Sequence, residues 1–274
     1  MNTKTIGIIQ IKGGAGRSTV ATNLAGELSK HGKAVLIDCD MPQGTAASWF
    51  SVRDRSGKSG NLIADTAINH RELVAKVEQH QDADFIVLDG PPRIAELTRA
   101  ILLLADLCLI PVGASAAEIW ATSDLLTLVE EAKKIKPVKA RMVWTRHRPY
   151  TKLAQELSDL AAKELGLAAL STSLGMRVSY MQALGDGLTV AELVEPSAKA
   201  EAVLAFAEAG AVPEITGAKQ AAADKRAFFA PEGYRRLTIN LREDLHKKLR
   251  LAAVEQDCNA TDIIVRLLEK ELEK

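Results

Sequence analysis

The sequence predicts an α/β protein with a doubly wound, mostly parallel sheet, followed by a small C-terminal β-α-α domain. Short continuous apolar runs alternate with amphipathic stretches over most of the chain. Such runs are typical of strands that are buried on both faces of a parallel sheet. Near the C-terminus, residues 235–242 instead alternate polar and apolar side chains, and two helical patterns follow them. This change of period predicts a second, different domain.

Length and composition set the limits for the function. The 274 residues suffice for one large domain and a small module. The formal net charge is zero, with 35 basic and 35 acidic residues, so bulk charge does not indicate a nucleic-acid partner. The three cysteines are widely spaced, which favours reduced thiols. No apolar run approaches the roughly 18 residues of a membrane span. We therefore expect a cytoplasmic protein without a membrane partner.

The elements of the first domain follow from this pattern. Strands are expected at residues 6–9, 34–37, 85–89, 107–112 and 141–145. Helices are expected after residue 19 and at residues 71–80, 96–104 and 117–134, and residues 151–209 are expected to be helical except for a weak strand near Leu170. Several strands end in carboxylates, and ligands of open α/β sheets bind at the carboxyl ends of the strands. A ligand site is therefore predicted at that edge.

A glycine-rich loop joins the first strand to the first helix, with the sequence Gln-Ile-Lys-Gly-Gly-Ala-Gly-Arg-Ser-Thr at residues 10–19. Glycines let the backbone approach an anion, and successive amides together with the helix N-terminus attract phosphate. A hydroxyl at the end of the loop, here Ser18, can bind magnesium. An ordinary glycine-rich turn would share this composition, so the later motifs decide between the two interpretations.

The loop departs from the strict Walker pattern, because Ile11 replaces its first glycine and Arg17 replaces its lysine. It resembles the deviant Walker A loop K-G-G-x-G-K-[ST]-[ST] of the ParA/MinD family of ATPases. The resemblance implies a P-loop fold, ATP and Mg²⁺ as cofactors, and a homodimer that encloses ATP, with Lys12 reaching the partner's phosphates. It assigns nucleotide binding to Lys12, Gly13, Gly14, Ala15, Gly16, Arg17, Ser18 and Thr19.

Two acidic segments also resemble this family. Asp89 ends an apolar strand and precedes Gly-Pro-Pro, which is similar to the family's D-x-P-P. Asp38 and Asp40 lie in a segment similar to D-x-D-P-Q-G, with Met41 inserted before the proline. The resemblance implies that Ser18, Asp38 and Asp89 hold the metal. It also implies that Asp40 orients the water that attacks the phosphate. Asp38, Asp40 and Lys12 are therefore the expected catalytic residues. Paired carboxylates can also cap a helix or lie in a solvated turn.

The resemblance extends over about residues 4–209. Residues 109–112 resemble the strand on the adenine side, and Thr145 stands where relatives often carry an asparagine that reads the base. Residues 185–190 resemble the late G-x-T-V stretch of ParA-type partition proteins. We therefore assign residues 1–209 to the ATPase domain.

Arg17 is the main departure from the family pattern. A guanidinium is larger than an ammonium, planar and always charged, and it can bind phosphate through two donors. We expect ATP to bind and to be hydrolysed slowly. The alternative is that Lys12 and the loop amides suffice and that the arginine is a tolerated replacement.

Residues 210–233 are expected to form a linker, and residues 234–274 resemble a ribbon-helix-helix module of the MetJ/Arc type. In that fold two chains place a two-stranded ribbon in the DNA major groove. The period-two pattern puts Arg236, Thr238 and Asn240 on one face, and these residue types can bind base edges. Amides near Ala260 and Thr261, at the start of the last helix, would bind phosphate. A dimerisation hairpin without a DNA role is the alternative.

The resulting prediction is a ParA-type ATPase for plasmid or chromosome partition. It would bind DNA non-specifically through the ATPase domain, bind a specific site through the tail, repress its own operon, and associate with the nucleoid. A ParB-like adaptor is a possible further partner. Two other functions stay open, namely a nucleotide-sensing repressor with little hydrolysis, and a MinD-like or carboxysome-positioning ATPase that acts on protein cargo.

Overall fold

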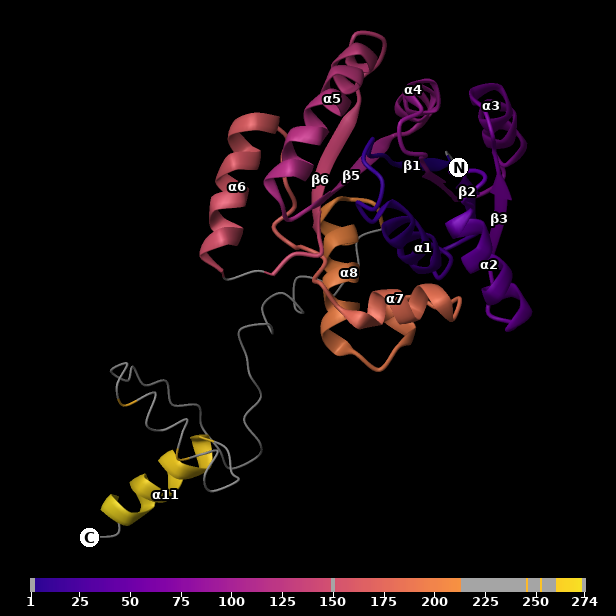
Figure 1. Ribbon diagram of the computed structural model, residues 1–274. Coiled ribbons are helices and arrows are strands. Elements are labelled where there is room, and N and C mark those ends of the chain that lie inside the picture. The colour runs from indigo at the N-terminus through magenta and orange to yellow at the C-terminus, as the bar shows by residue number, and fades with distance from the viewer. Residues whose placement is uncertain (1–2, 149–150, 213–244, 246–251, 253–259, 273–274) are drawn as a thin grey trace. The chain divides into compact units, whose positions relative to one another are not determined.

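The computed structural model describes residues 3–148, 151–212, 245, 252 and 260–272 (Figure 1). The chain divides into two compact units, Met1–Ala222 and Ala223–Lys274. The predicted DNA-reading residues Arg236, Thr238 and Asn240, and the ribbon they belong to, lie outside the described residues. The ribbon-helix-helix module and its boundaries therefore stay predictions.

The first unit is built on a six-stranded sheet with the strand order β3-β2-β4-β1-β5-β6. Every strand pairing in it is parallel. The strands are β1 (Lys4–Ile8), β2 (Ala34–Asp38), β3 (Leu62–Thr66), β4 (Phe85–Asp89), β5 (Leu107–Gly113) and β6 (Lys139–Thr145). The predicted parallel α/β sheet is confirmed.

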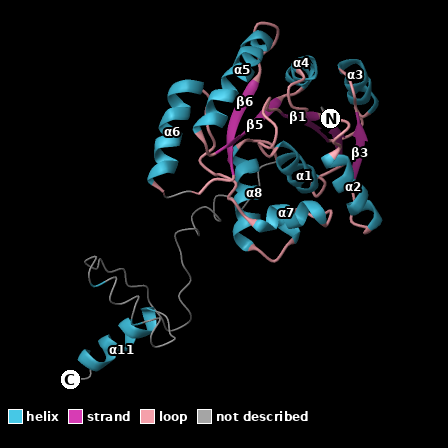
Figure 2. Cartoon of the chain, viewed as in Figure 1, coloured by secondary structure: helices cyan, strands magenta, loops and turns pink. Residues whose placement is uncertain are grey.

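Helices cover both faces of the sheet (Figure 2). The helices are α1 (Arg17–Leu28), α2 (Thr45–Arg55), α3 (His70–Gln79), α4 (Ala95–Leu104), α5 (Ala116–Lys133), α6 (Lys152–Leu165), α7 (Val178–Gly185) and α8 (Pro196–Glu208), with a 3-10 turn η1 (Val190–Glu192). One apolar core joins the sheet to α1, α2, α7 and α8, and a second core joins it to α3, α4, α5 and α6. This two-sided burial explains why the strands are apolar without alternation.

Side chains cap three of the helix starts in the described part of the first unit, and the start of α1 is among those without such a cap. The side chains of Asn69, Ser115 and Thr151 cap α3, α5 and α6 by accepting from backbone amides. Helix α1 has no such cap, because its N-cap residue is Gly16 with a φ of 94°. The first amides of α1 are therefore left without a side-chain acceptor, as an anion-binding helix start requires.

Two elements escaped prediction, and one prediction was wrong. Helix α2 has a charged residue, Arg53, among its three buried residues, and the edge strand β3 has only one fully buried residue in five, so neither carries a clear hydrophobic period. The weak strand expected near Leu170 is instead a pair of isolated bridges from Met142 to Ala169 and from His147 to Gly175. This segment runs beside edge strand β6 without forming a regular ladder.

The described part of the second unit contains helix α11 (Ala260–Leu272). Its start at Ala260 agrees with the expected start of the last helix near Ala260 and Thr261. Val265 and Leu267 are exposed within the described residues of this unit. None of the helices that the structure describes is long and apolar enough to cross a bilayer.

Candidate nucleotide site

The central strands bring the predicted loop and acids to one edge of the sheet. β1 lies between β4 and β5, and β4 pairs with β2 so that Asp38 and Asp89 are register partners. Ile8, the last residue of β1, is also in register with Asp89. The glycine-rich loop that follows β1 thus begins beside both carboxylates, at the edge where open α/β sheets bind ligands.

The loop requires its glycines for two different reasons. Gly14 and Gly16 have φ values of 76° and 94°, which side chains other than glycine rarely adopt. A Cβ atom at Gly16 would also lie 3.3 Å from Cγ2 of Thr145. The Thr145 hydroxyl donates to the carbonyl oxygen of Ala15 at 2.8 Å. Thr145 therefore fixes the position of the loop, and its predicted contact with adenine stays a prediction.

Gln10 ties the start of the loop to β5 and α5. The sequence analysis did not identify this residue. Its side-chain amide donates to the Pro111 carbonyl at 3.1 Å and to the Thr122 hydroxyl at 2.9 Å, and its Oε1 accepts from the amide of Ile11. Gln10 is buried. A polar side chain directly after a buried strand was the available signal, because a buried amide has to be hydrogen-bonded.

Arg17 is folded into the loop. Its Nη1 donates to the carbonyl oxygens of Gln10 and Lys12, each at 2.7 Å, and its Nη2 lies 3.3 Å from Oδ2 of Asp40. The side chain is only 6% exposed, and Nε is buried without a partner. Nε and Nη2 share one edge of the guanidinium, which is the fork that binds carboxylate or phosphate through two donors. Arg17 therefore holds the loop through Nη1 and pairs with Asp40 through Nη2, while its Nε stays buried without a partner among the described residues.

Lys12 contrasts with Arg17. It lies at the start of the exposed part of the loop, beside Gly13 and Gly14. Within the part of the chain that the structure describes, its ammonium group forms no hydrogen bond or ion pair. A free cation at this position is compatible with the predicted contact to a second chain.

The two buried carboxylates differ in what they bind. Asp38 accepts the amide of Asp40 with one oxygen and the amide of Ala47 with the other, each at 2.9 Å. It therefore fixes the acidic loop and the first turn of α2. Neither oxygen of Asp89 has a hydrogen-bond partner among the described residues, although the residue is fully buried. The predicted metal role thus rests mainly on Asp89.

Burial raises the pKa of Asp89 to about 7. The neighbouring Ser18 hydroxyl and Arg17 guanidinium oppose this rise, and Asp38 and Asp40 add to it. An unpaired buried carboxylate is costly and needs a reason. A divalent cation would neutralise it, and magnesium commonly takes only one or two carboxylates with phosphate and water. The residues present therefore fit Mg²⁺. Among the described residues, no group of three or more His, Cys, Asp or Glu side chains is placed to hold a metal ion.

Two cavities adjoin the loop. One of about 480 Å³ is lined by loop residues, Arg17, Ser18, Thr19, Asp40 and Gln43. The other, of about 210 Å³, lies between Gly16, Thr145 and the segment that contains Met176, Tyr180 and Met181. The first is polar and suits phosphates. The second is mostly apolar and suits a ring system.

A buried clamp joins α2 to residues 187–192. Arg53 donates to both carboxylate oxygens of Glu192 at 2.8 and 3.0 Å and to the carbonyl of Gly187 at 3.1 Å. Trp49 donates to the carbonyl of Leu188, and Asn23 of α1 accepts the amide of Val190. The sequence identified residues 185–190 only by resemblance. The structure shows that they connect α1 and α2, the two helices that begin at the loop and at the acidic segment.

The predicted phosphate-binding amides of the tail lie at the described start of α11, at Ala260 and Thr261. A DNA contact by these residues stays a prediction.

Comparisons with known proteins agree with this geometry. Residues 3–83 match the family model described as "AAA domain". The chain is 29% identical over 194 residues to the maintenance of carboxysome distribution protein A of Halothiobacillus neapolitanus, covering 69% of this chain and 87% of that protein. It is 27% identical over 235 residues to the chromosome-partitioning ATPase Soj of Thermus thermophilus, covering 75% and 94%.

Solved structures share the fold. An ATP complex of a Cyanothece McdA variant superposes with a TM-score of 0.66 at 19% identity, covering 78% of this chain and 99% of that one. The Mg-ADP complex of Pyrococcus horikoshii MinD gives a TM-score of 0.59 at 16% identity, covering 74% and 94%. The expected cofactors, ATP and Mg²⁺, are consistent with these complexes.

Proposed function

We propose that the chain is a ParA/MinD-type P-loop ATPase that hydrolyses ATP to position a DNA or protein cargo. The observation that carries this proposal is that the glycine-rich loop begins beside the buried carboxylate of Asp89. A phosphate cradle without a capping side chain lies beside an unpartnered carboxylate at the same sheet edge. That combination suits a Mg²⁺–nucleotide and has no structural role of its own.

Each residue of the nucleotide site has a defined role in this proposal. Phosphoryl transfer needs positioning and charge stabilisation more than covalent chemistry. The amides of residues 13–19 bind phosphate oxygens, and Ser18 and Asp89 hold the metal. Bound Mg²⁺ would neutralise the phosphate charge. Asp38 keeps the acidic loop in place through its two amide contacts. Asp40 orients the attacking water, and Lys12 reaches the phosphates of a second chain.

Arg17 sets the rate in this proposal. Its Nε is buried without a partner in the described structure, and its Nη2, the other donor on that edge of the guanidinium, lies 3.3 Å from Oδ2 of Asp40. The same carboxylate is then needed both by Arg17 and by the water. A lysine would offer a compact charge without this fork. We therefore propose that ATP binds and that hydrolysis is slow.

The proposed cargo is based on the relatives of the chain and on its predicted C-terminal module. Soj is a chromosome-partitioning ATPase, and the Halothiobacillus protein maintains carboxysome distribution. We propose partition of DNA as the main function, with an ATP-bound dimer on non-specific DNA and a C-terminal module that reads a site and represses the operon. A positioning ATPase with protein cargo is the second candidate, favoured by the carboxysome relative. A nucleotide-sensing repressor is the third, favoured by the engagement of Asp40 with Arg17.

ATP turnover by the full chain tests these alternatives, measured with and without random-sequence duplex DNA. We expect DNA-stimulated turnover that Lys12→Ala abolishes and Arg17→Lys raises several-fold. No turnover in the wild type, restored by Arg17→Lys, would support the nucleotide sensor. Turnover that ignores both DNA and Lys12→Ala would contradict the whole proposal. Exchange of Lys152, an exposed cation on α6, for alanine serves as the control.

A further inference from the structure

The segment that follows α7, residues 187–192, lies against both α1 and α2. These two helices are neighbours in the first unit, and α7 packs beside them (Figure 1). Each of them begins at one half of the nucleotide site, because α1 follows the glycine-rich loop and α2 follows the acidic segment with Asp38 and Asp40. We refer to residues 187–192 as the strap. The strap therefore touches the two helices that carry the site.

On the α1 side, the strap is held by Asn23. Its Oδ1 accepts the amide of Val190, and its Nδ2 donates to the carbonyl oxygen of Thr19, the last residue of the glycine-rich loop, each at 2.8 Å. A Cβ atom at Gly26 would lie 2.3 Å from Cγ2 of Thr189. A glycine inside a helix is unfavourable, so its presence indicates that α1 has to approach the strap this closely. One buried side chain thus joins the strap to the loop.

On the α2 side, a buried ion pair fixes the strap. Arg53 donates to both carboxylate oxygens of Glu192 at 2.8 and 3.0 Å, and to the carbonyl of Gly187 at 3.1 Å. The guanidinium lies 5.4 Å from the centre of the Trp49 ring, and the indole donates to the carbonyl of Leu188. Gly187 has a φ of 65°, and a Cβ atom there would lie 2.5 Å from the amide nitrogen of Arg53. A bidentate pair beside so close a backbone contact leaves the strap little freedom to slide along α2.

Glu192 also closes the strap on itself. Besides Arg53, it binds Thr189, whose amide donates to it at 2.7 Å and whose hydroxyl donates at 3.1 Å. Burial would raise the pKa of this carboxyl, but the hydrogen bonds from Arg53 and Thr189 hold the pKa below its usual range. Glu192 is therefore ionised at neutral pH and engages α2 and the strap together.

The start of α2 connects the strap to the acidic segment. The amide of Ala47 donates to Asp38, and the amide of Gly44 donates to the carbonyl oxygen of Asp40 at 2.8 Å. The backbone of Asp40 is thus tied to the first turn of α2. Helices transmit displacements as rigid elements, so a shift of α2 against α1 would move Asp40 against the glycine-rich loop.

We propose that the strap positions the acidic segment for ATP hydrolysis, with Asn23, Arg53 and Glu192 as its positioning residues. They act through the two helices by keeping α1 and α2 at a fixed spacing, and this inference rests on the proposed ATPase function. A displacement of about 1 Å in a catalytic group can cost roughly 100-fold in rate. Loosening the strap should therefore slow hydrolysis and leave nucleotide binding, which depends on the loop amides, nearly unchanged.

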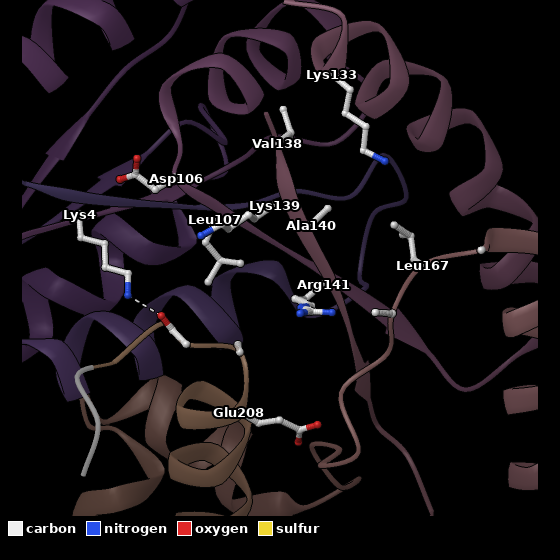
Figure 3. Close-up of a pocket in the computed structure, with 14 residues that line it drawn as sticks. Lys4, Asp106, Leu107, Lys133, Val138, Lys139, Ala140, Arg141, Leu167 and Glu208 are labelled. Atoms are coloured by element: carbon white, nitrogen blue, oxygen red, sulfur yellow. Dashed lines mark hydrogen bonds between the residues drawn. The ribbon is translucent and has the colours of Figure 1, made fainter. Parts of the chain in front are cut away.

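The control comes from the other end of the sheet. A cavity of about 630 Å³ lies at the amino ends of β1, β5 and β6, and Glu208 borders it (Figure 3). Like Glu192, Glu208 holds backbone amides, those of Ser171 and Thr172 at 2.6 and 3.0 Å, and it also accepts the Ser171 hydroxyl. It has no contact with α1 or α2 among the hydrogen bonds of the described residues. Glu208→Gln therefore reports what a general loosening of the fold does to activity.

The test measures ATP turnover and ATP affinity of the full chain with Glu192→Gln and with Glu208→Gln. Both substitutions keep the shape of the side chain and remove its charge. Glu192→Gln should lower kcat about tenfold and change ATP affinity less than about threefold, because Asp40 is displaced and the loop amides are not. Glu208→Gln should leave kcat and affinity within about twofold of the wild type. Equal effects on kcat, or a loss of affinity without a loss of kcat, would overturn the proposal.

A second variant tests whether the residues act through the same segment. Asn23→Ala releases the strap from α1 and leaves the pair of Arg53 and Glu192 intact. Combined with Glu192→Gln, it should lower kcat hardly more than the stronger single substitution, because both free one strap. Losses of kcat that multiply would show that the residues act separately and would reject the strap. If Glu192→Gln does not fold, Asn23→Ala alone is compared with Glu208→Gln in the same way.

Hydrogen exchange of the ligand-free proteins distinguishes a failure of this inference from a failure of the proposed ATPase function. The amides of Gly44 and Ala47 should exchange faster in Glu192→Gln than in Glu208→Gln or the wild type, because the start of α2 is less firmly held. This measurement needs no turnover. A wild type without turnover would reject the ATPase function, and faster exchange would still support positioning of the acidic segment by the strap. Unchanged exchange at these amides would overturn the inference even in an active ATPase.

Discussion

The two edges of one sheet use charge in opposite ways. At the carboxyl edge, Asp38, Asp89 and Arg17 are buried, and Asp38 and Arg17 are fixed by several short hydrogen bonds. At the amino edge, Lys139 and Arg141 are exposed and have no side-chain partner in the described structure. Buried charges are expensive, so each has to be satisfied by one geometry or one ligand. Exposed charges cost little and accept any polyanion.

Because of this difference, we expect the carboxyl edge to be specific for its ligand and the amino edge to attract anions in general. The carboxyl edge should discriminate among nucleotides and respond little to salt, because its charges are screened poorly. An anion that binds at the amino edge should be held without discrimination, and its binding should weaken as salt rises. Variants at each edge can test whether this contrast holds.

The largest effect is expected for Asp89→Asn. Its carboxyl pKa is about 7 in the folded chain, against an ordinary value of 3.8. A raised pKa means that the folded state binds the proton more tightly, so stability falls as the pH rises from about 4 to 7. Asp89→Asn should therefore stabilise the ligand-free protein at pH 8 by up to roughly 4 kcal/mol, with a gain that shrinks towards pH 4. Denaturant unfolding at the two pH values measures this difference.

The same variant should lose ATP turnover by about 100-fold or more, because the metal loses its buried carboxylate. A more stable but inactive protein would show that Asp89 is kept for function at the expense of stability. Asp106→Ala is the matched control from the other edge, and it should lose stability slightly while keeping its turnover. Unchanged stability at pH 8 would argue against an ionised, unpartnered Asp89.

The sequence predicted those parts of the fold and of the site that depend on local pattern. The apolar runs of β1, β2, β4, β5 and β6 are continuous because both faces are buried, and these strands were found. Helix α2 and strand β3 were missed because their burial comes from neighbours and leaves no clear period in the sequence. Tertiary context decides such elements.

Within the site, the loop and the carboxylates were identified from the residues and from their resemblance to the family. The hydrogen bonds that each carboxylate forms could not be predicted in this way. Asp38 and Asp89 look alike as acids at strand ends, yet one is saturated by amides and the other has no partner. Gln10 and Arg53 form hydrogen bonds with residues that lie 101 and 139 positions further along the chain, respectively. No local pattern carries such contacts.

A smaller effect is expected for Asp40→Asn, which weakens the pairing with Arg17. Nucleotide binding should strengthen a few-fold, because the guanidinium fork no longer shares its donors with a carboxylate. Turnover should fall about 10- to 100-fold, because an amide positions the attacking water less well than a carboxylate. Binding of a fluorescent ATP analogue and phosphate release measure the two effects. Asp124→Asn, an exposed acid on α5, should change neither. Weaker nucleotide binding in Asp40→Asn would show that Arg17 and Asp40 do not compete.

The smallest effect is expected for Thr145→Val, which keeps the shape of the side chain and removes one hydroxyl. The lost bond to Ala15 leaves a buried carbonyl without its donor, and this should cost roughly 1 kcal/mol of stability. If Thr145 only holds the loop, ATP and GTP should lose affinity equally, by a few-fold. If it also contacts the base, the ratio of ATP to GTP affinity should change. Thr145→Ser keeps the hydroxyl and should restore wild-type affinity in either case, because the loop contact needs only the oxygen.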